Sequence, residues 1–320
     1  MTIYQYLFGP VPSRRLGLSL GVDLTKHKTC SFDCVFCQLG RTAGQTIERK
    51  EYVPTAAVLD ELNRWIEAGG QADYITLAGS GEPTLHVDFG RVLEFIGSHS
   101  QIPSALLTNG GLMCLPEVRK AAAKASVVKL SLSAWDDASY RWINRPHSSL
   151  NFEDLIHSYQ IFRDMYDGQL WIEVFLIGGM NSVHAEIEKI ANIAKEILPD
   201  RIHLNTAVRP PAYDFVALVS QDELKTLAQL FEPIAEVIET ASIEQKSPPL
   251  QAQKDQIFNL LRRHPSTTEQ ISDVFGMHLN EVAKYIGELI ASGDIISVRQ
   301  NHMVYYRMHD TDKENEHAEG

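Results

Sequence analysis

The sequence predicts an α/β protein whose parallel strands form an open barrel, followed by a small second domain. Between residues 16 and 237, short apolar runs alternate with amphipathic helical stretches, which is the pattern of a parallel sheet. The 320 residues, 44% of them hydrophobic, can bury a full-sized core and a smaller one. The repeats are too few for a closed eight-stranded barrel, so we expect an open (β/α)6 partial TIM barrel.

The expected strands of the barrel are short apolar runs, and the expected helices repeat apolar residues every three or four positions. The strands are predicted at 16–24, 74–79, 103–109, 127–134, 169–177 and 201–210. The helices between them include 55–68, 115–125, 152–166 and 184–198, and a last helix is expected to end near Glu239. This alternation assigns residues 1–240 to the barrel.

The C-terminal region has a different pattern. Residues 241–253 are polar and contain prolines, as expected of a linker. Helices are predicted at 255–263, 267–275 and 279–292, and strands at 295–298 and 303–308. Three helices and a hairpin, with Gly276 in the turn before the third helix, predict a winged-helix domain over 254–308. The acidic tail, 309–320, lacks apolar residues and is expected to be disordered.

The charge distribution disfavours nucleic-acid binding by this second domain. The formal net charge is −12, which repels polyanions, and residues 254–308 carry as many acidic as basic side chains. We therefore favour a protein-contact or substrate-presenting role over DNA binding. The N-terminus shows neither a signal peptide nor a membrane span, so a cytoplasmic location without membrane contact is expected.

Three of the four cysteines form the triplet C-x3-C-x2-C: Cys30, Cys34 and Cys37. A disulfide framework is disfavoured, because three clustered cysteines cannot all pair. A zinc site with His27 as fourth ligand remains an alternative. The favoured interpretation is an iron-sulfur cluster, because a cluster held by three thiolates keeps one iron open for chemistry. The fourth cysteine, Cys114, is expected to be a packed thiol.

Polar residues follow several of the predicted strands. In parallel α/β folds ligands bind at the carboxyl ends of the strands, where the cysteine loop follows the first strand. The second strand ends in the glycine-rich turn Gly79-Ser80-Gly81-Glu82, and the third ends in Thr108-Asn109. Glycines allow close approach of the backbone to a ligand. These segments are expected to form one site.

Further candidates lie on the later strands. Ser131 and Ser133 alternate on one face, where they need a ligand, water or each other as partner. Glu173 and Asn205 are expected to face inward. Arg209, at the end of the last strand, could pair with a ligand carboxylate or with Glu173.

Two flanking segments carry arginines near the expected cavity. Residues 8–17 contain Arg14 and Arg15, and residues 142–147 contain Arg145. Their planar cations would suit a phosphate or carboxylate of the substrate. Solvated charges or ion pairs with the acidic excess are equally compatible with the sequence.

The triplet, with Phe36 before its last cysteine, resembles the signature of the radical SAM superfamily. The resemblance implies that Cys30, Cys34 and Cys37 hold a 4Fe-4S cluster whose fourth iron binds S-adenosylmethionine. It implies that reductive cleavage releases a 5′-deoxyadenosyl radical, which abstracts hydrogen from a substrate. The turn at Gly79 is similar to the superfamily's Gly-Gly-Glu-Pro motif, with Ser80 in place of a glycine. The cofactor contacts expected are Phe36, Gly79, Ser80, Gly81, Glu82, Thr108, Asn109, Ser131, Ser133, Glu173, Asn205 and Arg209.

Within the superfamily, residues 8–240 look most like the group related to tRNA wyosine synthases. Those synthases bind a second cluster through upstream cysteines, and this chain has none before Cys30. The predicted function is a radical SAM enzyme with an unidentified substrate, for which an RNA base or nucleotide is one candidate, served by an electron donor such as flavodoxin or ferredoxin. The alternatives are an activase or peptide-modifying enzyme acting on a partner protein, and an iron-sulfur sensor regulating transcription through the winged helix.

Overall fold

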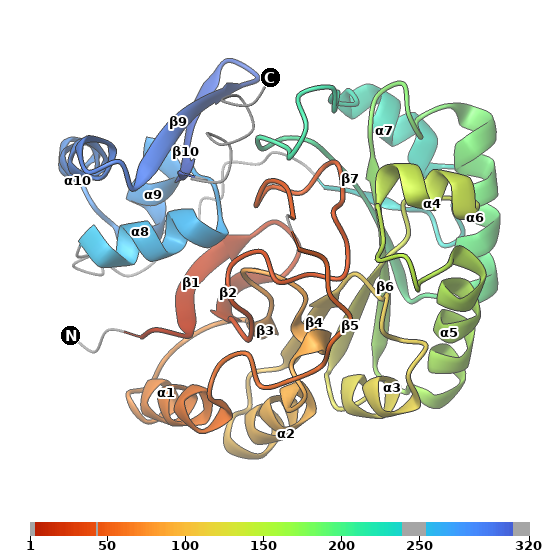
Figure 1. Ribbon diagram of the computed structural model, residues 1–320, viewed down its shortest axis with the longest axis horizontal. Coiled ribbons are helices and arrows are strands. Elements are labelled where there is room, and N and C mark those ends of the chain that lie inside the picture. Colours follow the sequence, from red (N-terminus) through yellow and green to blue (C-terminus); the bar gives the residue numbers. More distant parts are fainter. Residues whose placement is uncertain (1–3, 43, 239–253, 310–320) are drawn as a thin grey trace. The chain divides into compact units, whose positions relative to one another are not determined.

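The computed structural model describes residues 4–42, 44–238 and 254–309 (Figure 1). The chain divides into two compact units, Met1–Ile243 and Glu244–Gly320. The predicted linker, 241–253, and the predicted tail beyond His309 lie outside the described residues. Among the residues described, no helix is both long enough and apolar enough to cross a membrane.

The first unit is built on one eight-stranded sheet in which the strands follow the order of the sequence. The first two strands are antiparallel, and each later pair is parallel. The parallel order places the carboxyl ends of β2 to β8 at the same edge. The strands are β1 (Leu7–Ser13), β2 (Gly17–Val22), β3 (Tyr74–Leu77), β4 (Ser104–Thr108), β5 (Val127–Ser131), β6 (Gln169–Leu176), β7 (Arg201–Thr206) and β8 (Glu236–Val237).

Helices lie along the outer side of the curved sheet (Figure 1). Their apolar faces join those of the strands in one core that includes Val58, Phe89 and Phe162, each fully buried. Side chains cap three of the helices: Asp136 and Ser139 form a capping box, Asn151 accepts the Asp154 N–H, and Ser220 accepts the Glu223 N–H. The helices are α1 (Thr55–Glu67), α2 (Phe89–His99), α3 (Pro116–Ala122), α4 (Asp137–Ile143), α5 (Phe152–Met165), α6 (His184–Ile197) and α7 (Gln221–Ala228).

The six predicted strands are present as β2 to β7, and all of them are shorter than expected. The segment 8–17 was considered from the sequence only for its arginines, and most of it belongs to β1, a strand that was not predicted. Its Gly9, Pro10 and Pro12 interrupt the alternation by which strands are recognised in sequences. The helix expected to end near Glu239 ends at Ala228, and β8 follows Pro233, which helices exclude from their interior.

The second unit contains α8 (Lys254–Arg263), α9 (Thr268–Phe275), α10 (Leu279–Ala291) and an antiparallel hairpin of β9 (Ile295–Gln300) and β10 (Met303–Met308). A capping box of Thr267 and Gln270 starts α9. Gly276 ends it at φ +61°, a conformation that glycine adopts without strain. The elements lie within a few residues of their predicted positions.

Candidate functional site

The cysteine loop follows β2 and is held at the carboxyl edge of the sheet by isolated bridges to three other segments. Thr29 pairs with Gly81, Phe32 with Pro146, and Lys50 with His86. Gly81 has no room for a side chain, because a Cβ there would lie 1.9 Å from the Thr29 carbonyl oxygen. This close approach explains the glycine at position 81 and fixes the start of the cysteine loop against the end of β3.

The remainder of the glycine-rich turn is anchored on Asp23, at the end of β2. Gly79 adopts φ +151°, and a Cβ there would lie 2.6 Å from the Asp23 Cγ. The fully buried Ser80 donates its hydroxyl to Asp23 Oδ2 over 2.6 Å, and its backbone N–H lies 3.1 Å from Oδ1. Ser80, which stands where the motif has glycine, is thus bonded within the protein. Its predicted cofactor contact stays a prediction.

Glu82 lies at the centre of a hydrogen-bond network that joins the ends of β3 and β4. Its Oε1 accepts hydroxyls from Thr84 and Thr108 over 2.7 and 2.6 Å, and its Oε2 accepts the Asn109 backbone N–H over 2.8 Å. Burial raises the pKa of Glu82, and these neutral donors oppose that effect. No ion pair to this carboxylate occurs among the residues described. It therefore provides negative charge without a cation.

Side-chain amides point at two of the three sulfurs. Asn109 Nδ2 lies 3.5 Å from Cys30 Sγ, and Asn144 Nδ2 lies 3.6 Å from Cys34 Sγ. Burial raises the pKa of Cys30 to about 12, with the Glu82 charge adding to the effect. Burial also raises the pKa of Cys34 well above its usual value, and the Cys30 and Cys37 thiols contribute. The three sulfurs therefore lie within electrostatic range of one another.

These surroundings fit an iron-sulfur cluster in their chemistry. Thiolates are costly in this buried place, and binding to iron would offset that cost. Amide donors to cysteine sulfur are among the contacts that tune such clusters. Within 4–42, 44–238 and 254–309, no three His, Cys, Asp or Glu side chains form a group that could hold a metal ion. Cluster ligation by the triplet therefore rests on the donor set.

The segment 142–147, predicted to face the substrate, pairs with the cysteine loop through its backbone. Asp33 N–H donates to the Arg145 carbonyl and Val35 N–H to that of Ile143, each over 3.0 Å. The Arg145 guanidinium lies over the Tyr213 ring, 4.2 Å from its centroid, and 3.9 Å from Asp33 Oδ2. The segment thus braces the cysteines, and a contact of Arg145 with substrate stays a prediction.

Aromatic packing connects the cysteine loop to β6. Phe36 stacks on Phe175 with ring centroids 4.1 Å apart. Arg209 donates to Gln38 Oε1 over 3.2 Å, so the end of β7 also contacts this loop. Phe36 lies in the cysteine loop, and Arg209 contacts that loop through Gln38. Both were predicted as cofactor contacts, and that role stays a prediction.

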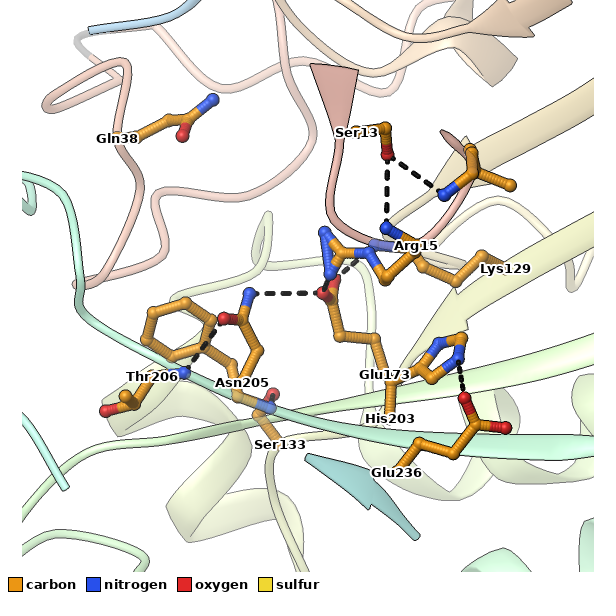
Figure 2. Close-up of polar contacts among 12 residues, drawn as sticks. Ser13, Arg15, Gln38, Lys129, Ser133, Glu173, His203, Asn205, Thr206 and Glu236 are labelled. Atoms are coloured by element: carbon orange, nitrogen blue, oxygen red, sulfur yellow. Dashed lines mark hydrogen bonds and ion pairs between the residues drawn. The ribbon is translucent and has the colours of Figure 1, made fainter. Parts of the chain in front are cut away.

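A charged cluster occupies the face of the sheet that carries Lys129, Glu173 and Asn205, called the inner face below. Glu173 on β6 pairs with Lys129 on β5 and with Arg15 from the turn between β1 and β2 (Figure 2). Asn205 Nδ2 on β7 donates to Glu173 Oε1 over 3.2 Å. Burial would raise the pKa of Glu173, but the two cations hold it well below its usual range. Glu173 and Asn205 face inward as predicted, and Arg15 is in an ion pair.

The two predicted serines differ. Ser133 Oγ accepts the Phe175 N–H over 3.1 Å, and the Asn181 amide donates to the Ser133 carbonyl over 2.8 Å. The half-buried Ser131 hydroxyl makes no hydrogen bond within the described part of the chain, whereas its carbonyl accepts the Tyr159 hydroxyl. Ser131 is thus the one of the pair whose hydroxyl is available. Arg14 lies half-buried in the β1–β2 turn.

Sequence reasoning missed several residues of the site. Lys129 follows the same alternation as Ser131 and Ser133, so the period of two could have identified it. Asn144 lies within a segment that was considered only for its arginine. Asp23 and Tyr159 carry no motif signal, because their partners are distant in sequence.

Comparisons with known proteins agree with these observations. The model of the radical SAM superfamily matches residues 25–194. The chain is 32% identical over 292 residues to the GTPase Obg of Brachyspira hyodysenteriae, and the match spans 90% of this chain and 43% of that protein. It is 34% identical over 229 residues to a UPF0026 protein of Methanocaldococcus jannaschii, covering 71% of each. A radical SAM methyltransferase from Sphaerobacter thermophilus shares the fold, with a TM-score of 0.50 at 20% identity over 68% of this chain and 66% of that one.

Proposed function

Because the chain belongs to the radical SAM superfamily and to the UPF0026 proteins, we propose that its cysteine loop is the cofactor site of a radical-forming enzyme. Membership makes it an enzyme that uses a 4Fe-4S cluster and S-adenosylmethionine. In our proposal, Cys30, Cys34 and Cys37 hold the cluster. The observation that carries the proposal is the network in which Asn109 contacts both the Cys30 sulfur and Glu82.

When both cofactors are bound, the reduced cluster would supply an electron to the sulfonium of S-adenosylmethionine, and the adenosyl radical so provided would abstract hydrogen from the substrate. The residues of this chain bind and orient S-adenosylmethionine. Glu82 offers its negative charge to the ammonium of the methionine moiety, because no cation forms an ion pair with it among the described residues. Ser131 offers its available hydroxyl to the ribose. Phe36 and Phe175 cover the loop with apolar surface that excludes water.

We propose that residues 1–240 form the open (β/α)6 partial barrel, with β1 and β8 as additions, and that 254–308 form a winged helix after the linker. The acidic side chains among its helices favour contact with a protein or a substrate over DNA. An electron donor such as flavodoxin or ferredoxin and a cytoplasmic location complete the proposal. Two alternatives remain for the substrate: one related to that of the tRNA wyosine synthases, or a partner protein on which an activase acts.

The test is anaerobic reconstitution of the chain with iron and sulfide, followed by reduction with dithionite in the presence of S-adenosylmethionine. We expect visible absorbance from thiolate-to-iron charge transfer in the cluster, and formation of 5′-deoxyadenosine. Cys34→Ala should lose both. Cys114→Ala is the matched control, since that thiol, which was expected to be packed, is exposed and lies outside the triplet, and the variant should keep both.

Two outcomes would contradict the proposal. A Cys34→Ala protein that keeps its cluster would remove the triplet as the ligand set. A wild-type protein that binds a cluster and shifts DNA, yet leaves S-adenosylmethionine intact, would favour the iron-sulfur sensor.

A further inference from the structure

We propose that Lys129 and Arg15 form a binding site for an oxyanion, a carboxylate or phosphate carried by the substrate, on the inner face of the sheet. This inference rests on the proposed function, which places the radical chemistry at the cysteine edge. Four kinds of observation support the site: the burial of its charges, their imbalance, the unused donors and the position beneath the cysteine loop.

The first observation is the burial of ionised groups where such folds place apolar side chains. Lys129 is 7% exposed and Glu173 is 8% exposed. Two residues earlier on the same strands, Val127 and Trp171 belong to an apolar cluster with Leu16. Because side chains alternate along a strand, the charged cluster forms a separate layer above that apolar floor. Lysine is almost never fully buried unless it is paired.

The second observation is that this layer carries more positive than negative charge. Arg15 and Lys129 are two cations, and Glu173 is the carboxylate that pairs with both. His203, beside them on β7, does not compensate: burial lowers its pKa to about 4, with the Arg15 charge adding to that effect, so it is neutral at pH 7. Burial lowers the pKa of Lys129, and the charges of Glu173 and Glu82 oppose that effect, so a bound anion would further favour the protonated lysine.

Two other carboxylates lie nearby, and both are committed elsewhere. Glu82 accepts its hydrogen bonds from Thr84, Thr108 and Asn109 at the edge of the sheet. Glu236 is half-exposed, lies 3.6 Å from Arg201 and faces His203 Nε2 over 3.7 Å (Figure 2). Neither forms an ion pair with Arg15 or Lys129 in the described structure.

The third observation is that both cations keep donors in reserve. An ammonium has three N–H donors, and the one bond recorded for Lys129 goes to Glu173 Oε2. A guanidinium has five, and Arg15 uses Nη1 for Glu173 Oε1. The remaining N–H groups can donate to an oxyanion without breaking the pairs with Glu173, in the way that arginine and lysine bind carboxylate and phosphate elsewhere.

The fourth observation is position. Phe175 follows Glu173 by two residues on the same face of β6 and stacks on Phe36, the neighbour of Cys37. Two residues of strand span about 6.6 Å, so the charged layer lies one step below the cysteine loop. An anion held by Lys129 would direct the rest of its molecule toward that loop. S-adenosylmethionine is proposed to bind at the loop itself, which leaves this layer to the substrate.

The experiment measures anion binding with His203 as a local reporter. The ring proton signals of His203, assigned by their loss in His203→Gln, are followed at pH 7 by NMR while inorganic phosphate or succinate is added to the full-length chain. We expect a saturable shift with at least one of the two probes, and the stronger probe distinguishes phosphate from carboxylate. Lys129→Met should weaken that binding by about tenfold or more, because it removes a charge-assisted hydrogen bond.

Two further variants complete the design. Lys129→Arg keeps the charge and should retain the anion-dependent shift of the His203 signals. It is the variant to measure if Lys129→Met does not fold. Lys195→Met removes an exposed lysine on α6 and should behave as the wild type. The proposal fails if neither probe moves His203, or if Lys129→Met binds like the wild type.

Binding of S-adenosylmethionine separates this proposal from the one on which it rests. After reconstitution of its cluster, Lys129→Met should bind S-adenosylmethionine with the wild-type affinity. Without substrate, it should cleave S-adenosylmethionine slowly, as the wild type does. If its affinity for S-adenosylmethionine falls instead, the anion is the cofactor's own carboxylate, and the substrate site is excluded. If the wild type cleaves no S-adenosylmethionine but binds phosphate at Lys129, the proposed function fails while the anion site stands.

Discussion

Glu82 and Glu173 are two buried carboxylates of one sheet with opposite electrostatic surroundings. Glu82, at the edge beside the cysteines, accepts hydrogen bonds from neutral groups, and burial raises its pKa. Glu173, one layer down, pairs with Arg15 and Lys129, and its pKa is held well below the usual range despite burial. The contrast is consistent with our two proposals, a cationic ligand group at the edge and an anionic one below it.

The largest expected effect comes from breaking the lower layer. Glu173→Gln would leave the charges of Arg15 and Lys129 facing each other without a counter-ion in a buried place. We expect the free energy of unfolding to fall by about 3 to 5 kcal/mol, as when one partner of a buried ion pair is removed. Urea denaturation followed by circular dichroism measures it. A control is Glu232→Gln, whose carboxylate pairs with Lys195 on the surface and should be nearly neutral.

A change of less than about 1 kcal/mol in Glu173→Gln would mean that solvent reaches the layer and screens the cations. Addition of phosphate should partly restore the stability of Glu173→Gln, because the anion replaces the lost charge. This second measurement connects the stability of the layer to its proposed ligand.

The lower layer also predicts a pH dependence. Burial, with the Arg15 charge, lowers the pKa of His203 to about 4, against about 6.5 in an unfolded chain. Between these values the unfolded state binds more protons, so stability falls as the pH decreases from about 6.5 to 4. His203 alone contributes a loss of about 3 kcal/mol over that range.

Because other groups titrate in acid as well, the test compares wild type with His203→Gln by urea denaturation at a series of pH values. The variant should show a flatter decline, with the difference confined to the range below about pH 6.5. Equal slopes for the two proteins would show that Glu236, which faces His203 Nε2, stabilises the protonated ring enough to cancel the depression.

The fold and the upper layer could largely be predicted from the sequence. In the lower layer the inward positions of Glu173 and Asn205 could be predicted, but the ion pairs of Glu173 could not. Cys30, Glu82 and Asn109 lie in short motifs directly after strands, and strand order brings such positions to one edge. The lower layer instead depends on Arg15, which reaches Glu173 from a turn 158 residues away in sequence. Propensity describes local segments and contains no information on such pairs, which is why Lys129 was overlooked within an apolar strand.

The same limit explains why β1 was not predicted within residues 8–17. Their glycine and prolines indicate a loop, but pairing with β2 overrides that local signal and makes them an edge strand. Arg15 is therefore held by the turn of a hairpin rather than by a mobile segment. This rigid position suits a residue that pairs across the sheet.

The smallest expected free-energy change tests the upper layer. Glu82→Gln keeps an oxygen acceptor for the Thr108 hydroxyl and loses the negative charge, so the fold should tolerate it better than Glu173→Gln. The affinity for S-adenosylmethionine, measured by equilibrium dialysis of the reconstituted protein, should fall by about 1.5 to 3 kcal/mol, the range for a hydrogen bond to a charged group. Glu61→Gln is the matched control, because that buried carboxylate accepts backbone N–H groups of β1 and its neighbours away from the cysteines. If the two variants bound the cofactor equally well, Glu82 would serve only to join the strand ends, and the contrast between the layers would be one of folding rather than of ligand charge.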